Sequence, residues 1–170
     1  MKNSKLRALL FSDVHLYHAK TKTEHIARGL HRALADNERL RDIDIIFISG
    51  DLFDRSVHMP NTDTHYVINF VCHLLEMCHK YDIELRVLEG TPSHDWKQAR
   101  LIIDINANRL HPVDVRHVTV LSIEHIERFG IDVLYVPDEW GEGCAATFKE
   151  VEDLLIKHNL EKVDLSIMHA

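Results

Sequence analysis

The sequence contains little glycine and proline, and it has no long apolar run. Of its 170 residues, 6 are Gly and 4 are Pro, which excludes collagen-like chains and low-complexity disorder. No apolar run reaches the roughly 18–20 residues that a membrane-spanning helix needs. The first residues also lack the apolar stretch and the cleavage site of a signal peptide. We therefore expect a cytoplasmic protein with no membrane partner.

Positive charge is also scarce, with 20 Lys and Arg against 27 Asp and Glu and a net charge of −7. This balance excludes a module that coats DNA through clustered basic residues. The 3 cysteines, Cys72, Cys78 and Cys144, form no CxxC pair, so we expect reduced thiols. Hydrophobic residues make up 45% of the chain. That composition and this length predict one globular domain over residues 1–170.

Strand-like and helix-like segments alternate along the chain. We expect strands at 6–12, 43–49, 84–89, 115–121, 122–129, 131–136 and 163–168, the first of them buried. Apolar residues at helical spacing predict helices at 23–40, 62–80, 97–108 and 145–158. Three parallel strands with intervening helices, then several antiparallel strands, then a helix and a last strand, indicate a layered α/β or α+β domain.

Chemically reactive side chains follow four of these predicted strands. Asp13 and His15 follow the first strand, and Asp51 and Asp54 follow the second. The third strand is followed by His94 and Asp95, and the last by His169; the seven positions are Asp13, His15, Asp51, Asp54, His94, Asp95 and His169. Because the carboxyl ends of parallel strands share one edge of a sheet, we expect these side chains to converge there.

Crowded carboxylates repel one another and need cations. A ligand set of Asp and His without Cys favours Mn²⁺, Fe²⁺ or Zn²⁺ over Ca²⁺ or Mg²⁺ alone. Two such ions about 3.5–4 Å apart would activate a water molecule and neutralise a phosphate. The alternative is that each Asp is a helix cap or turn former, which is the commoner role for any one of them taken alone.

The order of these residues resembles the calcineurin-like metallophosphoesterase superfamily. The family pattern is DxH, GDxxD, GNH(D/E), an isolated His after a strand, and GHxH, whose two histidines complete both metal sites. Here the matches are Asp13-Val14-His15, Gly50-Asp51-Leu52-Phe53-Asp54, a variant at 90–95, and His169. The resemblance implies a four-layer αββα sandwich that holds two divalent ions, here lacking its C-terminal strands.

One branch of that superfamily is especially similar. The stretch GDLFDRSVHMPN at 50–61, followed by an apolar helix, resembles the SbcCD-type nucleases that repair DNA double-strand breaks. This resemblance implies a phosphodiesterase acting on DNA ends with two Mn²⁺ ions, and Mg²⁺, Fe²⁺ and Zn²⁺ remain alternatives. It also implies an SMC-like ATPase partner, and it leaves a homodimer open.

The resemblance assigns a role to each matching residue. Asp13 and His15 would bind the first ion, Asp51 would bridge both ions, and His169 would bind the second with a contribution from Ser93. Asp54 would orient a ligand or a water molecule. His94 would act as the catalytic acid, and Asp95 would fix the tautomer of His94. Apart from the resemblance, Arg55, His18 and His58 are candidate substrate contacts, although a solvated or ion-paired role is as common for an arginine. Trp96 and Trp140 could stack on a base, although burial is the commoner role of tryptophan.

Two departures from the family pattern keep other functions open. Ser93 stands where the family has an asparagine ligand, with two extra residues before it, and no GHxH occurs before Ala170. We therefore expect the chain to be the N-terminal part of a longer protein, or a form with incomplete sites. One alternative is a small-molecule phosphatase or cyclic-nucleotide phosphodiesterase. The other is a catalytically inactive module that uses the fold to bind a partner.

Overall fold

The computed structural model describes residues 5–35, 38–57, 62–138 and 144–169. Five α-helices, one 3₁₀ helix and seven strands are described, and none of these helices is long and apolar enough to cross a membrane. In chain order they are β1 (Ala8–Phe11), α1 (Thr23–Ala35), the 3₁₀ helix η1 (Glu38–Asp42), β2 (Ile45–Ser49), α2 (Thr64–Tyr81), β3 (Glu84–Leu88), α3 (Pro92–Asp95), α4 (Arg100–Ala107), β4 (Val115–Val118), β5 (Ser122–Ile126), β6 (Ile131–Val136), α5 (Cys144–Lys157) and β7 (Leu165–Met168).

The strands form two sheets, and the predicted mixed α/β class is confirmed. The first sheet has the order β1-β2-β3-β4, with all neighbours parallel. The second has the order β5-β6-β7, in which β5 is antiparallel and β7 parallel to β6. We expected β4 among the antiparallel strands, and that prediction was wrong. The helical crossover through α3 and α4 returns the chain beside β3, which permits parallel pairing.

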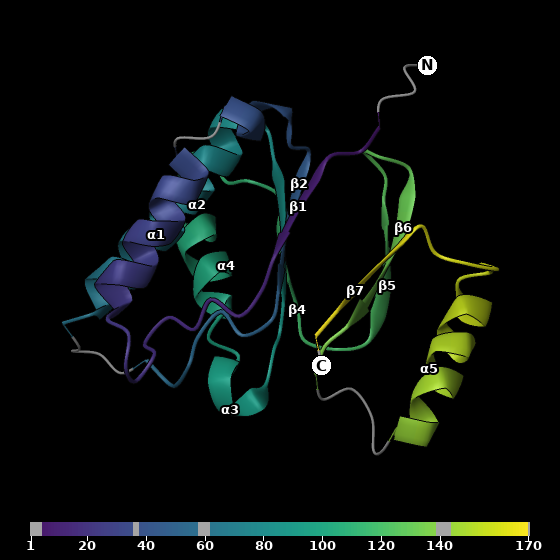
Figure 1. The fold of residues 1–170 in the computed structure, drawn as a ribbon. Helices are drawn as coiled ribbons and strands as arrows, with labels where there is room; N and C mark the ends of the chain where they lie inside the picture. The colour runs from purple at the N-terminus through teal and green to yellow at the C-terminus, as the bar shows by residue number, and fades with distance from the viewer. Residues whose placement is uncertain (1–4, 36–37, 58–61, 139–143, 170) are drawn as a thin grey trace.

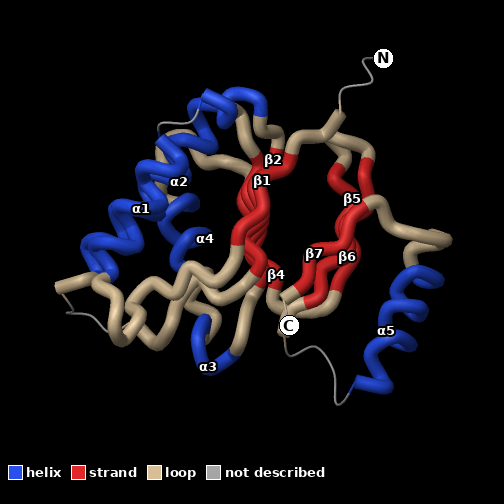
Figure 2. The backbone as a smooth tube through the Cα atoms, in the orientation of Figure 1, coloured by secondary structure: helices blue, strands red, loops and turns tan. Residues whose placement is uncertain are grey.

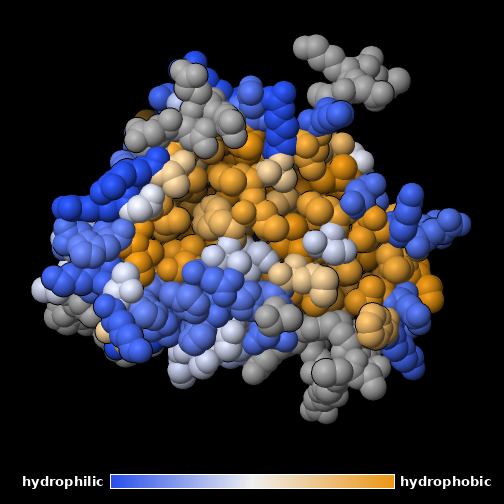
Figure 3. Space-filling model, in the orientation of Figure 1, coloured by the Kyte–Doolittle hydropathy of each residue, from blue (hydrophilic) through white to orange (hydrophobic). Residues whose placement is uncertain are grey.

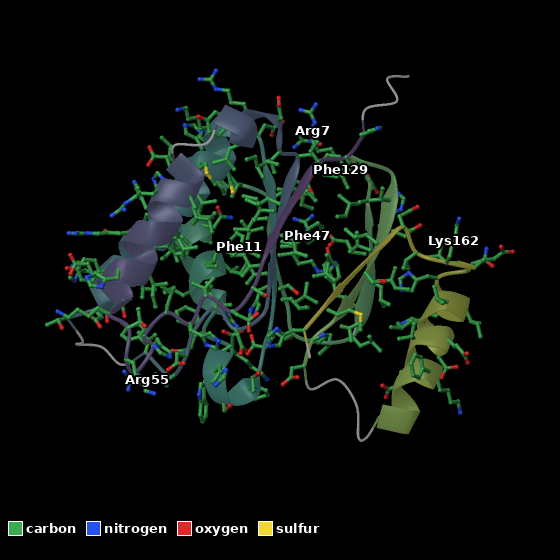
Figure 4. The ribbon with its side chains drawn as sticks, viewed as in Figure 1. Arg7, Phe11, Phe47, Arg55, Phe129 and Lys162 are labelled. Carbon is green, nitrogen blue, oxygen red and sulfur yellow. The ribbon has the colours of Figure 1, made fainter. Side chains whose placement is uncertain are left out.

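Apolar clusters lie on both faces of the first sheet. Figure 1 shows α1, α2 and α4 on one face of that sheet, the second sheet on its other side, and α5 beyond the second sheet. Successive side chains of β2 alternate between the two faces. Ile46 and Ile48 join the helix cluster, whereas Phe47 points between the sheets, with its ring centroid 6.4 Å from that of Tyr135 (Figure 4). Because both faces are covered, β2 is buried throughout its length.

Strand β1 corrects a second prediction, since we expected it to be buried. It is an edge strand whose residues are exposed or only half-buried, and Leu10 is 56% exposed. Strand β7 is the corresponding edge of the second sheet, where Met168 is also 56% exposed. Figure 3 shows apolar side chains gathered across the middle of the face on which these two strands lie. In β1, Leu9 and Phe11 therefore pack against the helix cluster, while the strand as a whole stays partly exposed because it lies at the edge of the sheet.

A buried charged network links the two sheets. The Arg86 side chain on β3 is only 4% exposed and donates to Glu84 at 3.0 Å, to Glu124 on β5 at 3.0 Å and to Asp114 at 3.2 Å. The Tyr135 hydroxyl donates to Glu124 at 2.7 Å. Burial lowers the pKa of Arg86, but the hydrogen bonds and charges of Glu124 and Asp114 outweigh burial and raise it. The guanidinium is therefore charged and compensates the buried carboxylates.

Arg86→Ala is expected to destabilise the fold by about 3–5 kcal/mol, because removing one partner leaves buried charges unpaired. Urea unfolding followed by circular dichroism measures this loss. Arg7→Ala is the matched control, because Arg7 forms an exposed ion pair with Asp42 at 2.9 Å (Figure 4). Its urea midpoint should hardly change, since exposed pairs contribute little. Equal midpoints for the two variants would contradict a stabilising role for the Arg86 network.

Candidate metal centre

The segments that follow β1 and β2 lie side by side at one end of the sheets. Backbone hydrogen bonds join them: the N–H of Asp13 donates to the Gly50 carbonyl at 3.2 Å and that of His15 to the Asp51 carbonyl at 3.0 Å. In return, the N–H of Asp54 donates to the Leu16 carbonyl at 2.8 Å. Figure 2 shows the loops of this end gathered near α3. The two sequence motifs therefore form one structural unit.

Left-handed backbone is concentrated in this unit. The φ angles are 54° at Asp13, 51° at His15, 69° at Tyr17 and 49° at Asp51, and Gly50 has a φ of 85°. Residues other than glycine seldom adopt this region, and such strain gathers at functional sites where the surrounding structure maintains it. Here the strained residues include three of the predicted ligands.

Two glycines permit the close approach of the site residues. A Cβ on Gly50 would overlap the His169 ring, and a Cβ on Gly90 would overlap the backbone nitrogen and carboxylate of Asp51. Any side chain at either position would therefore displace a predicted ligand. This contact explains why glycine precedes Asp51 and begins the loop after β3.

Asp51 lies at the centre of the cluster and is 4% exposed. Its Oδ2 lies 2.7 Å from Nδ1 of His94 and 3.9 Å from Nε2 of His15, while its Oδ1 lies 3.2 Å from Nε2 of His169. The Thr91 N–H also donates to Oδ1 at 2.7 Å. Burial raises the pKa of Asp51, but the hydrogen bonds from His94 and Thr91 and the charge of His169 outweigh burial and lower it. The two oxygens of an ionised carboxylate thus face different histidines.

The orientation of His169 is fixed by the end of β2. Its Nδ1 lies 2.8 Å from the Ser49 carbonyl, and the Ser49 hydroxyl donates to the Met168 carbonyl at 2.6 Å. Since a carbonyl can only accept, Nδ1 carries the proton. In the neutral form of this ring the Nε2 lone pair would face Asp51 Oδ1, whereas a protonated ring would donate to it. Two acceptors 3.2 Å apart need a cation or a second proton between them, and this pattern of a ring N–H on a carbonyl is typical of metal-binding histidines.

His15 lies between three carboxylates. Its Nε2 is 3.8 Å from Asp13 Oδ1 and 3.9 Å from Asp51 Oδ2, and its Nδ1 is 3.5 Å from Asp54 Oδ1. The Nδ1 atom is buried and forms no hydrogen bond with the described residues. These separations are too long for hydrogen bonds, but an ion bonded at about 2.0–2.2 Å to each ligand would span roughly 4 Å. His15, Asp51 and His94 place ligand atoms within 4.8 Å of one another. The donor set therefore fits a divalent cation.

The role that we expected for Asp95 needs a correction. Its carboxylate is fully buried, and its oxygens accept the N–H groups of Phe53 at 2.9 Å and Gly90 at 2.7 Å. Burial raises the pKa of Asp95 although both hydrogen bonds lower it. The group hydrogen-bonded to the His94 ring is Asp51, not Asp95. Asp95 instead joins the loops after β2 and β3, and so it positions the site.

The remaining candidates lie around this cluster. Ser93 is exposed, and its backbone carbonyl accepts a hydrogen bond from the Trp96 indole N–H at 2.7 Å. The Arg55 side chain donates to the Tyr17 carbonyl at 2.9 Å and lies on the outer side of the loops (Figure 4). The His18 ring lies 6.4 Å from that of His15. His58 and Trp140 lie outside the described residues.

Sequence reasoning missed Thr91 and Ser49. The Thr91 N–H binds Asp51, and its hydroxyl lies 3.4 Å from the same carboxylate. Ser49 binds the end of β7 through both its hydroxyl and its carbonyl. Their positions could have indicated them, because each residue lies at or just beyond the end of a strand that precedes a predicted ligand.

A scan of the sequence against protein-family models finds no matching family, and a search of curated proteins finds no similar protein.

Proposed function

We propose that the protein is a metal-dependent phosphodiesterase with two divalent ions bound at the ends of β1, β2, β3 and β7. Asp13 and His15 would hold one ion and His169 the other, with Asp51 shared between them. The observation that supports this proposal best is the Asp51 carboxylate, whose two oxygens face His15 and His169 separately. Bound there, the ions would activate water and neutralise the phosphate.

The protein's own residues would then control protons and orientation. The hydrogen bond to Asp51 raises the pKa of His94, although burial opposes it, so the ring stays protonated over more of the neutral pH range. Its imidazolium can give a proton to the leaving oxygen of a phosphodiester. Asp54 lies 3.5 Å from Nδ1 of His15, so it would orient that ring if the two groups moved to hydrogen-bond distance when an ion binds. Ser93 remains a candidate ligand of the second ion.

The finer assignments belong to the same proposal. The helix–sheet–sheet–helix order of Figure 1 supports a four-layer αββα sandwich. Ligands that are carboxylates and imidazoles without thiolates suit Mn²⁺, Fe²⁺ or Zn²⁺, and Mn²⁺ is proposed among these on the strength of the resemblance to the nuclease branch. DNA is the proposed substrate and an SMC-like ATPase the proposed partner, both on the strength of the GDLFDRSVHMPN motif.

Incubation with linear DNA tests the proposal. We expect degradation with Mn²⁺ and none with EDTA, and slow turnover because few ligands surround each ion. Parallel assays with p-nitrophenyl phosphate and cyclic nucleotides distinguish the alternatives. Hydrolysis of these small substrates with DNA left intact would favour the phosphatase or cyclic-nucleotide function. No hydrolysis of any substrate at saturating Mn²⁺ would contradict catalysis and favour a binding module.

A further inference from the structure

Trp96 is an exposed aromatic residue next to the candidate metal centre. It directly follows α3, two residues after His94, and is 61% exposed. Trp96 and Lys97 both have left-handed backbone, with φ of 49° and 58°. A bulky residue in this region has a strained backbone. Burial of the indole does not offset the energy of that strain, because most of the ring is exposed to solvent. The exposed position of the ring therefore calls for a binding role.

The indole is held in one orientation before any ligand arrives. Its Nε1–H donates to the Ser93 carbonyl at 2.7 Å, so the polar edge of the ring already has a partner. The remaining surface of the side chain is its flat apolar face. A fixed aromatic face offers stacking without the loss of side-chain freedom that a mobile residue would suffer on binding.

Grooves lie on either side of Trp96. One, of about 400 Å³, runs toward α2 and α4, and the other, of about 640 Å³, lies along the loop after β3 that adjoins the candidate metal centre. The residues that line the larger groove include Gly90, Pro92, Ser93, Trp96, Lys97 and Glu89. The oxygens of the Glu89 carboxylate are already engaged, one by the backbone N–H of Lys97 and the other by Nε2 of His117 at 2.7 Å. Gly90 contacts Asp51, and Ser93 precedes His94. A ligand stacked on Trp96 in this groove would therefore reach the cluster around Asp51.

Basic side chains lie next to the larger groove. Among the described residues, no carboxylate lies within ion-pair distance of the Lys97 ammonium, and Lys97 also lines a third groove, of about 470 Å³, together with Arg100 and Arg116. The Arg100 and Arg116 side chains are 77% and 41% exposed, and each also faces a carboxylate, Asp104 at 3.6 Å and Glu124 at 3.5 Å respectively. In a chain of net charge −7, this grouping is the feature expected along the path of a phosphate backbone.

We propose that Trp96 is the stacking platform for a nucleobase next to the scissile phosphate, with Lys97 at the adjoining phosphate. This inference rests on the proposed function for the identity of the stacked base, because the phosphodiester at the Asp51 cluster fixes which base reaches the indole. The stacking itself and the charge of Lys97 need no bound ion. The ligand class is a single strand with at least one unstacked base, since a base within a duplex has no free face. Stacking tolerates any base, so the platform confers affinity and register and not sequence specificity.

Fluorescence of Trp96 tests the proposal without hydrolysis. In the Trp140→Phe background Trp96 is the sole tryptophan, and titration with the pentanucleotide dT5 in EDTA should quench its emission. An abasic pentamer of the same backbone should bind about 5- to 100-fold more weakly, the range expected for one stacked base. Anisotropy of a labelled dT5 should show the same loss for Trp96→Ala and a small change for Trp96→Phe.

Phe148→Ala is the matched control, because Phe148 on α5 is 78% exposed and far along the chain from the site. Its affinity for dT5 should not change. Equal affinity for dT5 and the abasic pentamer, full affinity in Trp96→Ala, or no saturable binding of dT5 would each overturn the proposal. The binding titrations contain EDTA, whereas hydrolysis is assayed with Mn²⁺. A failure of hydrolysis would therefore contradict the proposed function without changing the result of the stacking test.

Discussion

Asp51→Asn is expected to abolish Mn²⁺-dependent hydrolysis and to lower the number of Mn²⁺ ions bound per chain. The carboxylate faces His15 with one oxygen and His169 with the other, so an amide would remove charge from both proposed ion sites. Changing residues that merely support a ligand weakens metal binding by about 10–100-fold, and we expect a larger loss for a shared ligand. Calorimetric titration with Mn²⁺ measures the stoichiometry, and degradation of DNA measures the activity.

Asp132→Asn is the control for this variant. Asp132 also lies beside a histidine, His125, at 2.9 Å, but on β6 at the start of the strand. It should keep the Mn²⁺ stoichiometry and the turnover of the parent protein. Two tightly bound ions and full activity in Asp51→Asn would show that Asp51 is not the shared ligand.

His94→Ala is expected to lower turnover by about 10²–10⁴-fold, the usual contribution of a positioned acid, while Mn²⁺ stays bound. The ring lies 2.7 Å from Asp51 and at 5.1 Å, edge to face, from the His15 ring, so it is close enough to serve either as an acid or as a ligand. The loss should shrink for p-nitrophenyl esters, because a good leaving group needs little protonation. Steady-state kinetics on two leaving groups separates these roles.

His125→Ala is the matched control, because it removes an exposed histidine that is also paired with an aspartate. Its turnover should match that of the parent protein on both substrates. An equal loss on both leaving groups in His94→Ala, or the loss of a bound ion, would rule out the acid and make His94 a ligand or a structural residue.

Local patterns in the sequence predicted most elements of the fold, but not the partners of every strand. The helix at Thr64–Tyr81 and the strand at Ile131–Val136 follow from periodicity and from the flanking turn residues. The exposure of β1 and the pairing of β4 with β3 depend on residues far away in the chain. A run such as Ala8–Phe11 is equally apolar at an edge and at a centre, so no local pattern distinguishes the two positions.

The site shows the same division. The position of polar residues after strands predicted the grouping of His15, Asp51 and His94, since the ends of neighbouring parallel strands lie at one edge of a sheet. His169 joins this group from β7 in the second sheet, so the packing of the two sheets, and not the edge of one sheet, brings it there. The partner of each side chain could not be predicted in this way. Whether Asp95 binds His94 or the backbone of Phe53 depends on how two loops from different strands are placed, which no local pattern records. Asp and His are enriched among the non-glycine residues with left-handed φ, but this preference is too weak to have singled out Asp13, His15 and Asp51.

Anomalous diffraction from a crystal soaked in Mn²⁺ tests the central claim most directly, because it locates the ion without any assay of activity. The proposal predicts two peaks, one within bonding distance of His15 and Asp51 and one within bonding distance of Asp51 and His169. The Nε2 of His169 and the Oδ1 of Asp51, now 3.2 Å apart, should both bind the second ion. A fully occupied Mn²⁺ peak elsewhere on the protein, or no peak beside Asp51 at saturating Mn²⁺, would contradict the claim.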